Sequence, residues 1–115
     1  MQKGILPNSN LQGEKMANNF ILSRKAVEDL SGIWEYTIHT WSETQADKYY
    51  YMLLGACQDL ADGNAGAKQY PEIHSDLFGI RAGQHIIFFR RIEKGTIQVV
   101  RILHNRMDLR NRIEE

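Results

Sequence analysis

The chain has 115 residues and no net charge, and its 43% hydrophobic and 24% charged content is ordinary for one globular domain. No apolar run reaches the roughly 18 residues of a membrane helix, and the first fifteen residues lack the pattern of a signal peptide, so we expect a cytoplasmic protein without a membrane partner. The single cysteine, Cys57, excludes an intrachain disulfide and, within one chain, a cysteine-based zinc site.

The zero net charge conceals two halves of opposite sign. Residues 1–76 hold six Lys and Arg against ten Asp and Glu, whereas residues 77–115 hold eight basic against four acidic residues. A basic half on a neutral chain indicates an acidic partner, either nucleic acid or an acidic protein segment, unless it forms a solvated face.

Residues 1–17 are predicted to be a flexible N-terminal extension, and residues 18–115 a single folded domain. The extension is polar, contains Gly4, Pro7 and Gly13, and shows no periodicity. Met16 offers an alternative start of the chain. The first regular element expected after the extension is a short strand over residues 19–22.

Two amphipathic helices are predicted next, paired as an antiparallel hairpin. Ser23 can cap the first helix, Ser42 and Gln45 form a capping box for the second, and Gly63 ends it. Apolar residues recur at three- and four-residue steps, so each helix should bury one face. These residues are Val27, Leu30, Ile33, Trp34, Ile38 and Trp41 in the first helix and Ala46, Tyr50, Leu53, Cys57 and Leu60 in the second. We expect the aromatic residues and the cysteine of these faces to pack in the core.

The pattern then changes from helix to strand. After a loop over residues 64–75, three stretches rich in β-branched and aromatic residues (77–81, 85–92 and 96–104) are separated by short turns with a glycine, which predicts two consecutive hairpins. Both faces of these strands are apolar. The helical hairpin can cover only one, so the other requires the C-terminal helix expected near residues 107–113, or a partner. The predicted fold is α+β, with helices on a small, mostly antiparallel sheet.

Arginines on the strands are the residues most suited to chemistry or recognition. Arg81, Arg91 and Arg101 come from consecutive strands and could converge on one sheet face, with His104 or Arg106 at its rim. Such a cluster could hold phosphates or, with a proton carrier, cleave RNA. His104 is the only proton carrier at a strand end, whereas metal-free cleavage usually needs two. The arginines could instead form structural ion pairs, for example with acids at positions 76, 93 or 108. The histidines are scattered and predict no metal site.

Three stretches carry a resemblance to a known family. They are F-x-L-S-x-x-A-x-x-D-L at residues 20–30, G-I-R-x-G-x-H-x-I-F-F-R at residues 79–90 and I-L-H-N-R-M-D-L at residues 102–109. The sequence resembles ParE-type toxins of the RelE/ParE superfamily over residues 18–113. The resemblance implies a helical hairpin on an antiparallel sheet, and a toxin of a type II toxin–antitoxin module that an antitoxin's C-terminal segment wraps and neutralises in a hetero-oligomer.

The resemblance also implies a target. ParE-type members trap the cleaved-DNA complex of DNA gyrase, whereas RelE-type members cut mRNA on the ribosome with a Lys/Arg cluster and a C-terminal Tyr or His–Tyr pair. Here Asn105-Arg106-Met107 follows His104, and this departure favours a gyrase inhibitor that is not an enzyme, needs no cofactor and does not bind nucleic acid directly. The alternatives are an mRNA interferase using Arg81, Arg101 and His104, or an inactive antitoxin-binding homologue.

Two sets of contact residues follow from this hypothesis. Those expected to contact the target are Arg81, Arg90, Arg101, His104, Arg106, Asp108 and Arg110. Those expected to contact the antitoxin are Trp34, Ile86, Phe88, Val100 and Ile102.

Overall fold

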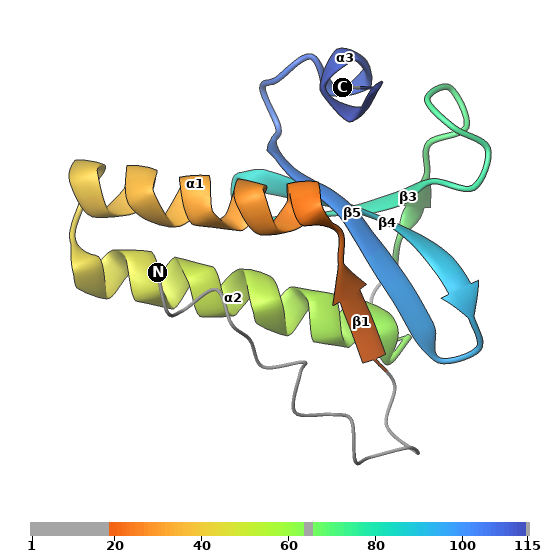
Figure 1. Cartoon of the computed structure of the whole chain (residues 1–115), viewed down its shortest axis with the longest axis horizontal. Coiled ribbons are helices and arrows are strands. Elements are labelled where there is room, and N and C mark those ends of the chain that lie inside the picture. The colour runs from red at the N-terminus through yellow and green to blue at the C-terminus, as the bar shows by residue number, and fades with distance from the viewer. Residues whose placement is uncertain (1–18, 64–65, 115) are drawn as a thin grey trace.

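A computed structural model describes residues 19–63 and 66–114 of the chain, in which two long helices cover one face of a five-stranded sheet (Figure 1). The elements in chain order are β1 (Asn19–Leu22), α1 (Arg24–Thr40), α2 (Glu43–Ala61), β2 (Lys68–Gln69), β3 (Phe78–Ala82), β4 (His85–Glu93), β5 (Thr96–His104) and α3 (Leu109–Glu114). This is the predicted α+β fold. The predicted N-terminal extension lies outside the described residues.

The sheet has the order β1-β5-β4-β3-β2. β1 runs parallel to β5, with Phe20 opposite Ile97, and the remaining neighbours are antiparallel. Both predicted hairpins are present, and Gly83 and Gly95 adopt positive φ in their turns, a conformation that a residue with a Cβ rarely takes. The two-residue strand β2 falls in the predicted loop, because its polar Lys68–Gln69 sequence has no strand periodicity.

Both helices begin where their caps predict. The Ser23 hydroxyl accepts from the Ala26 N–H at 3.0 Å and donates to the Val100 carbonyl at 2.7 Å, so one side chain starts α1 and ties it to β5. The Ser42 hydroxyl accepts from the Gln45 N–H at 3.1 Å and starts α2.

The core between the helices and the sheet contains most of the predicted apolar stripe. Tyr50, Leu53 and Cys57 of α2 are buried, as predicted. Two predictions for α1 are wrong: Trp41 is 73% exposed and Val27 is 38% exposed. The buried residues of α1 are Ala26, Leu30 and Thr37. Val27 lies one position from this stripe, and the backbone at Trp41 has already left the helix, which turns its side chain away from the core.

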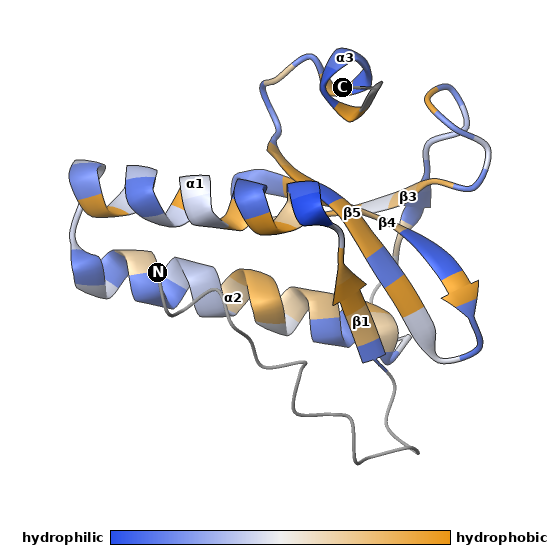
Figure 2. Ribbon diagram, in the orientation of Figure 1, coloured by the Kyte–Doolittle hydropathy of each residue, from blue (hydrophilic) through white to orange (hydrophobic). Residues whose placement is uncertain are grey.

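The opposite face of the sheet carries a second, smaller core. It consists of Leu77, Ile86, Phe88 and Leu103, and it is covered by Tyr70, Ile73, Val100, Leu109 and Ile113. The cover therefore comes from the segment before β3 and from α3, which is the intramolecular alternative left open by the sequence. Figure 2 shows the apolar side of α3 turned toward the sheet.

Candidate functional site

A groove of about 1130 Å³ lies along α1. One wall is the α1 face that carries Asp29, Gly32, Ile33, Tyr36 and Thr37, and it extends to Trp41. The other wall comes from the end of β5 and the segment leading into α3. Tyr49 of α2 and Gln84 of the β3–β4 turn also line the groove. Most of the predicted C-terminal target motif thus borders a groove whose opposite wall is helical.

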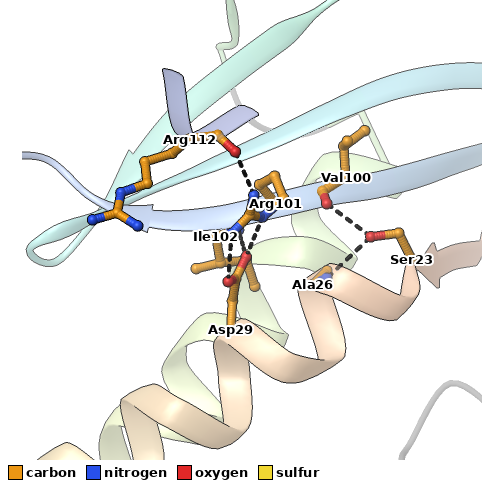
Figure 3. A network of polar contacts seen from close by, with 7 residues as sticks. All are labelled: Ser23, Ala26, Asp29, Val100, Arg101, Ile102 and Arg112. Atoms are coloured by element: carbon orange, nitrogen blue, oxygen red, sulfur yellow. Dashed lines mark hydrogen bonds and ion pairs between the residues drawn. The ribbon is translucent and has the colours of Figure 1, made fainter. Parts of the chain in front are cut away.

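Arg101 is held in a buried ion pair beside this groove. Its Nε donates to Asp29 Oδ2 at 2.9 Å and a terminal nitrogen donates to Oδ1 at 3.0 Å, with the two side chains only 10% and 13% exposed. Asp29 Oδ2 also accepts from the Ile102 N–H at 2.9 Å. Another Arg101 nitrogen donates to the Arg112 carbonyl of α3, as Figure 3 shows. One guanidinium thus connects α1, β5 and α3.

This geometry corrects the expected role of Arg101 as a surface or catalytic residue. Its guanidinium fork is occupied by a carboxylate and a carbonyl of the same chain, so the structural ion pair is the arrangement observed. The sequence offered acids at positions 76, 93 and 108 as partners. The observed partner, Asp29, lies 72 residues away on α1, and only the packing of α1 on β5 brings the two together.

The predicted convergence of three strand arginines is also wrong. Arg81 is in register with Ile86, on the side of the smaller core, whereas Arg91 is in register with Ile97, on the helix side. Arg91 lies 5.2 Å from the ring centroid of Phe78 and 5.5 Å from that of Phe89, as cation–π contacts. Successive side chains of a strand point to opposite faces of the sheet, and Arg81 and Arg91 point to different faces.

The remaining predicted target contacts lie at the surface, except His104, which is half-buried. Arg81 donates to the Gly83 carbonyl at 3.0 Å, and Arg90 is 3.9 Å from Asp76. Arg110 donates to the Glu72 carbonyl, and Asp108 accepts from Asn111 Nδ2 at 2.6 Å. The arginines of this set that are exposed, Arg81, Arg90, Arg106 and Arg110, lie on β3, β4 and the C-terminal segment.

Most of the predicted antitoxin contacts are occupied within the chain. Ile86 and Phe88 belong to the smaller core, and Ile102 belongs to the core under the helices, so their side chains are buried in this structure. Val100 is half-buried below α3. The Trp34 indole donates to Asp47 Oδ1 at 3.1 Å and links α1 to α2. Within the described residues, α3 and the segment before β3 cover the sheet face that carries Ile86 and Phe88.

The groove contains a cluster of titratable groups that the sequence reasoning missed. Tyr49 Oη lies 2.7 Å from His85 Nδ1, and the rings of His85 and His104 meet edge to face at 5.3 Å between centroids. Tyr49 comes from α2, so local periodicity could not place it beside two strand residues. The β3–β4 turn approaches this tyrosine so closely that a Cβ at Gly83 would lie 2.6 Å from Tyr49 Oη.

Backbone N–H groups hold two members of this cluster. The Tyr49 hydroxyl accepts from the Gln84 N–H at 2.9 Å and shares its second hydrogen bond with His85 Nδ1. His104 Nδ1 accepts from the Arg106 N–H at 3.1 Å. The neutral His104 imidazole therefore carries its proton on Nε2. Burial, and then the neighbouring His104, lower the pKa of His85 to about 4, and burial raises the pKa of Tyr49.

Other kinds of site find little support. Within residues 19–63 and 66–114, no group of three or more His, Cys, Asp or Glu side chains could hold a metal ion. Burial raises the pKa of the Cys57 thiol to about 12, which makes it a poor nucleophile. None of the described helices combines the length and hydrophobicity needed to cross a membrane.

Comparison with known proteins identifies the family. The profile described as "ParE toxin of type II toxin-antitoxin system, parDE" matches residues 20–109. The chain belongs to the ParE toxin family. It is 35% identical to Toxin ParE1 of Mycobacterium tuberculosis over 94 residues, covering 82% of this chain and 96% of that protein. It is also 33% identical to Toxin ParE of Escherichia coli over 96 residues, covering 84% and 93%.

A solved structure supports the fold of this ParE-type toxin. A chain described as the chromosomal ParDE TA system from P. aeruginosa superposes with a TM-score of 0.59 at 21% identity, covering 77% of this chain and 96% of that one. The family match begins at Phe20 and ends at Leu109, so it includes most of β1, both long helices and the motif that ends β5.

Proposed function

We propose that this ParE-type toxin inhibits DNA gyrase in the bacterial cytoplasm by stabilising the cleaved-DNA complex, and that a ParD-type antitoxin neutralises it. The observation that carries the proposal is the set of exposed arginines, Arg81, Arg90, Arg106 and Arg110, in a chain of the ParE family. Exposed basic side chains suit contact with a large, partly acidic target, and one of them, Arg106, lines the groove.

The contact mechanism rests on how the arginines are used. Arg101 would be central to phosphate chemistry, but it is neutralised by Asp29 and nearly buried. Exposed arginines can form new pairs with a partner without first breaking a buried ion pair, whereas removing Arg101 from Asp29 would leave a buried charge without compensation. The toxin is therefore proposed to act by binding, without catalysing a reaction itself.

The direct test incubates the purified chain with gyrase, ATP and supercoiled plasmid, followed by detergent and protease. We expect linear DNA that depends on the toxin and disappears when antitoxin is added. The charge reversal Arg106→Glu should reduce linear DNA at least tenfold. Arg24→Glu, an exposed reversal of the same charge on α1, is the matched control and should retain activity. Intact plasmid at excess wild-type toxin would reject the proposal.

A second function is favoured by one observation: Tyr49, His85 and His104 place three proton carriers together, where the sequence offered only His104. General acid–base cleavage of RNA requires such groups. This alternative predicts ribosome-dependent mRNA cleavage that His104→Ala removes without loss of antitoxin binding. Translated mRNA that stays intact with wild-type toxin would reject it.

A further inference from the structure

Two hydrogen-bond acceptors of the turn that follows β5 come from one residue, His104. Its carbonyl accepts from the Met107 N–H at 3.0 Å, and its ring Nδ1 accepts from the Arg106 N–H at 3.1 Å. A side-chain acceptor for the N–H two residues later is the arrangement that Asn and Asp use in an Asx turn. An imidazole holds that position here, so the acceptor of this turn is a group that can take up a proton.

This turn fixes the start of the C-terminal segment. The chain leaves the end of β5 and reaches α3 through residues 105–108 (Figure 1). The Asn105 N–H donates to the Gln84 carbonyl at 3.0 Å, and the Gln84 N–H donates to Tyr49 Oη at 2.9 Å. The turn is thereby tied to the β3–β4 turn and to α2. A change at His104 therefore acts on the connection from β5 to α3.

The second histidine of the cluster decides which ring changes its charge first. The rings of His85 and His104 meet edge to face, with 5.3 Å between their centroids, so two imidazolium ions here would repel each other. Burial, and then His104, lower the pKa of His85 to about 4, so His85 stays neutral at mildly acidic pH. Histidine side chains ordinarily change their charge between about pH 5 and pH 8. The half-buried His104 is the member of the pair that can do so.

The titratable and charged groups around His104 come from every element that borders the groove. They are Glu28 and Asp29 on α1, Arg101 on β5, Arg106 in the turn and Arg112 on α3, with Tyr49 of α2 and His85 of β4. Arg81 of β3 adds a positive charge near Tyr49. Because Asp29 is already paired with Arg101, a proton added to His104 increases an existing excess of positive charge.

Protonation turns the acceptor of the turn into a donor. Neutral His104 accepts at Nδ1, whereas the imidazolium carries a proton on both nitrogens and can only donate. The Nδ1–H would then point at the Arg106 N–H, so two donors would face each other in place of a hydrogen bond. The contact is relieved only if the ring rotates away or the turn opens, and either movement removes the acceptor from Arg106.

We propose that His104 is a pH-sensitive closure of the turn over residues 104–107, which the neutral ring holds closed and which opens when the ring takes up one proton from solvent. Opening releases the segment that leads into α3 and displaces Arg106 from the edge of the groove. Acidification therefore weakens any contact that this arginine makes. The inference goes beyond the proposed function, because it concerns the conformation of the free toxin and holds whatever the target is.

Nuclear magnetic resonance of the full-length chain tests the closure directly. The quantity measured is the protection of the Arg106 amide from exchange with water, corrected for the intrinsic effect of pH, at about pH 7.5 and about pH 5.5. In the wild type we expect about tenfold less protection at the lower pH, because the amide has lost its acceptor. The loss should follow the titration of the His104 ring, which is observed in the same samples.

Two substitutions separate the acceptor from the charge. His104→Asn keeps an oxygen that can accept from the N–H of residue 106 in an Asx turn but does not titrate, so protection should be equal at both pH values. His104→Leu has neither the acceptor nor the charge and should show low protection at both. His74→Asn is the matched control, since it makes the same change at an exposed histidine that is paired with Asp76 outside the groove, and it should behave as the wild type.

Two results would overturn the inference. The first is equal protection of the Arg106 amide at both pH values in the wild type. The second is a His104→Asn variant that loses protection as the wild type does, because the response would then come from another group, such as His85. Unchanged chemical shifts of core amides, such as that of Phe89, show that a variant is folded. If His104→Leu does not fold, the comparison of the wild type with His104→Asn still decides. No gyrase or antitoxin enters the measurement, so its result is independent of the proposed function.

Discussion

The two faces of the sheet are closed in different ways. On one face, 17 residues of α1 and 19 of α2 bury side chains such as Leu53, Cys57 and Phe89 completely. On the other, the cover is the six-residue helix α3 and the segment before β3. The first cover is held by extensive apolar packing, whereas α3 adds a polar attachment through Arg101 to a smaller apolar contact.

This difference separates the main hydrophobic core from the C-terminal segment. The helix side supplies the main hydrophobic core, and the thinner side supplies the C-terminal segment that borders the groove. Arg101 holds α3 through the Arg112 carbonyl and is itself held by Asp29 of α1. The position of the C-terminal segment, which includes Arg106, therefore depends on an acid of the helix side.

Asp29→Ala should have the largest effect, because it breaks the connection between the two sides. The change removes three hydrogen bonds and leaves the Arg101 charge nearly buried and uncompensated. We expect a loss of about 3–5 kcal/mol in unfolding free energy. Urea denaturation measures it, and hydrogen exchange should show loss of protection in α3. Wild-type stability in this variant would contradict a structural role for the pair.

The unequal covers can be compared by two leucine truncations. Leu53→Ala opens a cavity in the fully buried core under the helices and should cost about 3 kcal/mol. Leu109→Ala, in the half-buried cover on α3, should cost about 1 kcal/mol, because less apolar area returns to water. Denaturation midpoints of the two variants test the order. Equal costs would mean that the two covers contribute alike.

Tyr49→Phe tests a polar contact on the helix side of the sheet, where α2 meets the start of β4. The change leaves His85 Nδ1 and the Gln84 N–H without their observed partner, and we expect a loss of about 1–2 kcal/mol. Tyr51→Phe, an exposed tyrosine on the same helix, is the control and should change stability by less than about 0.5 kcal/mol.

The pH dependence of stability should report on His85 separately. Its pKa is about 4 in the folded chain against 6.5 for an unperturbed histidine, so the unfolded state binds the proton first as the pH falls. The contribution of neutral His85 to the unfolding free energy is therefore complete above pH 6.5, and it is lost as the pH falls toward 4. Melting curves between pH 7 and 4 should therefore fall more steeply for the wild type than for His85→Gln. Parallel curves would contradict the buried, neutral imidazole.

Trp41→Ala should have the smallest effect on the fold. The side chain is largely exposed, so unfolding free energy should change by no more than about 0.5 kcal/mol in thermal melts. A large loss would show that Trp41 contributes to the core after all.

The sequence predicted those features that depend on local periodicity. The caps at Ser23 and Ser42, the helical hairpin and the two glycine turns were all placed correctly, because each depends on residues a few positions apart. The family resemblance was confirmed by the profile match.

The candidate site depended on contacts that periodicity does not encode. Asp29 meets Arg101 across 72 positions, and Tyr49 meets His85 across 36. The positions of the arginines on the strands are visible in the sequence. The sequence does not show which of these arginines forms an ion pair with an acid of the same chain. The exposure of Trp41 was not predicted for a similar reason, since the end of a helix is decided by backbone geometry and not by the spacing of apolar residues.

The parallel pairing of β1 with β5 has a consequence for how the toxin is made. The first described strand finds its neighbour only at Thr96–Val99, and Ser23 reaches Val100 across 77 positions. During translation the chain cannot complete its sheet until nearly all of it has been synthesised, because contacts this distant in sequence wait for their later partner. We therefore expect a nascent chain interrupted before residue 96 to present a helical hairpin without a finished sheet, and toxicity to begin only with the completed polypeptide.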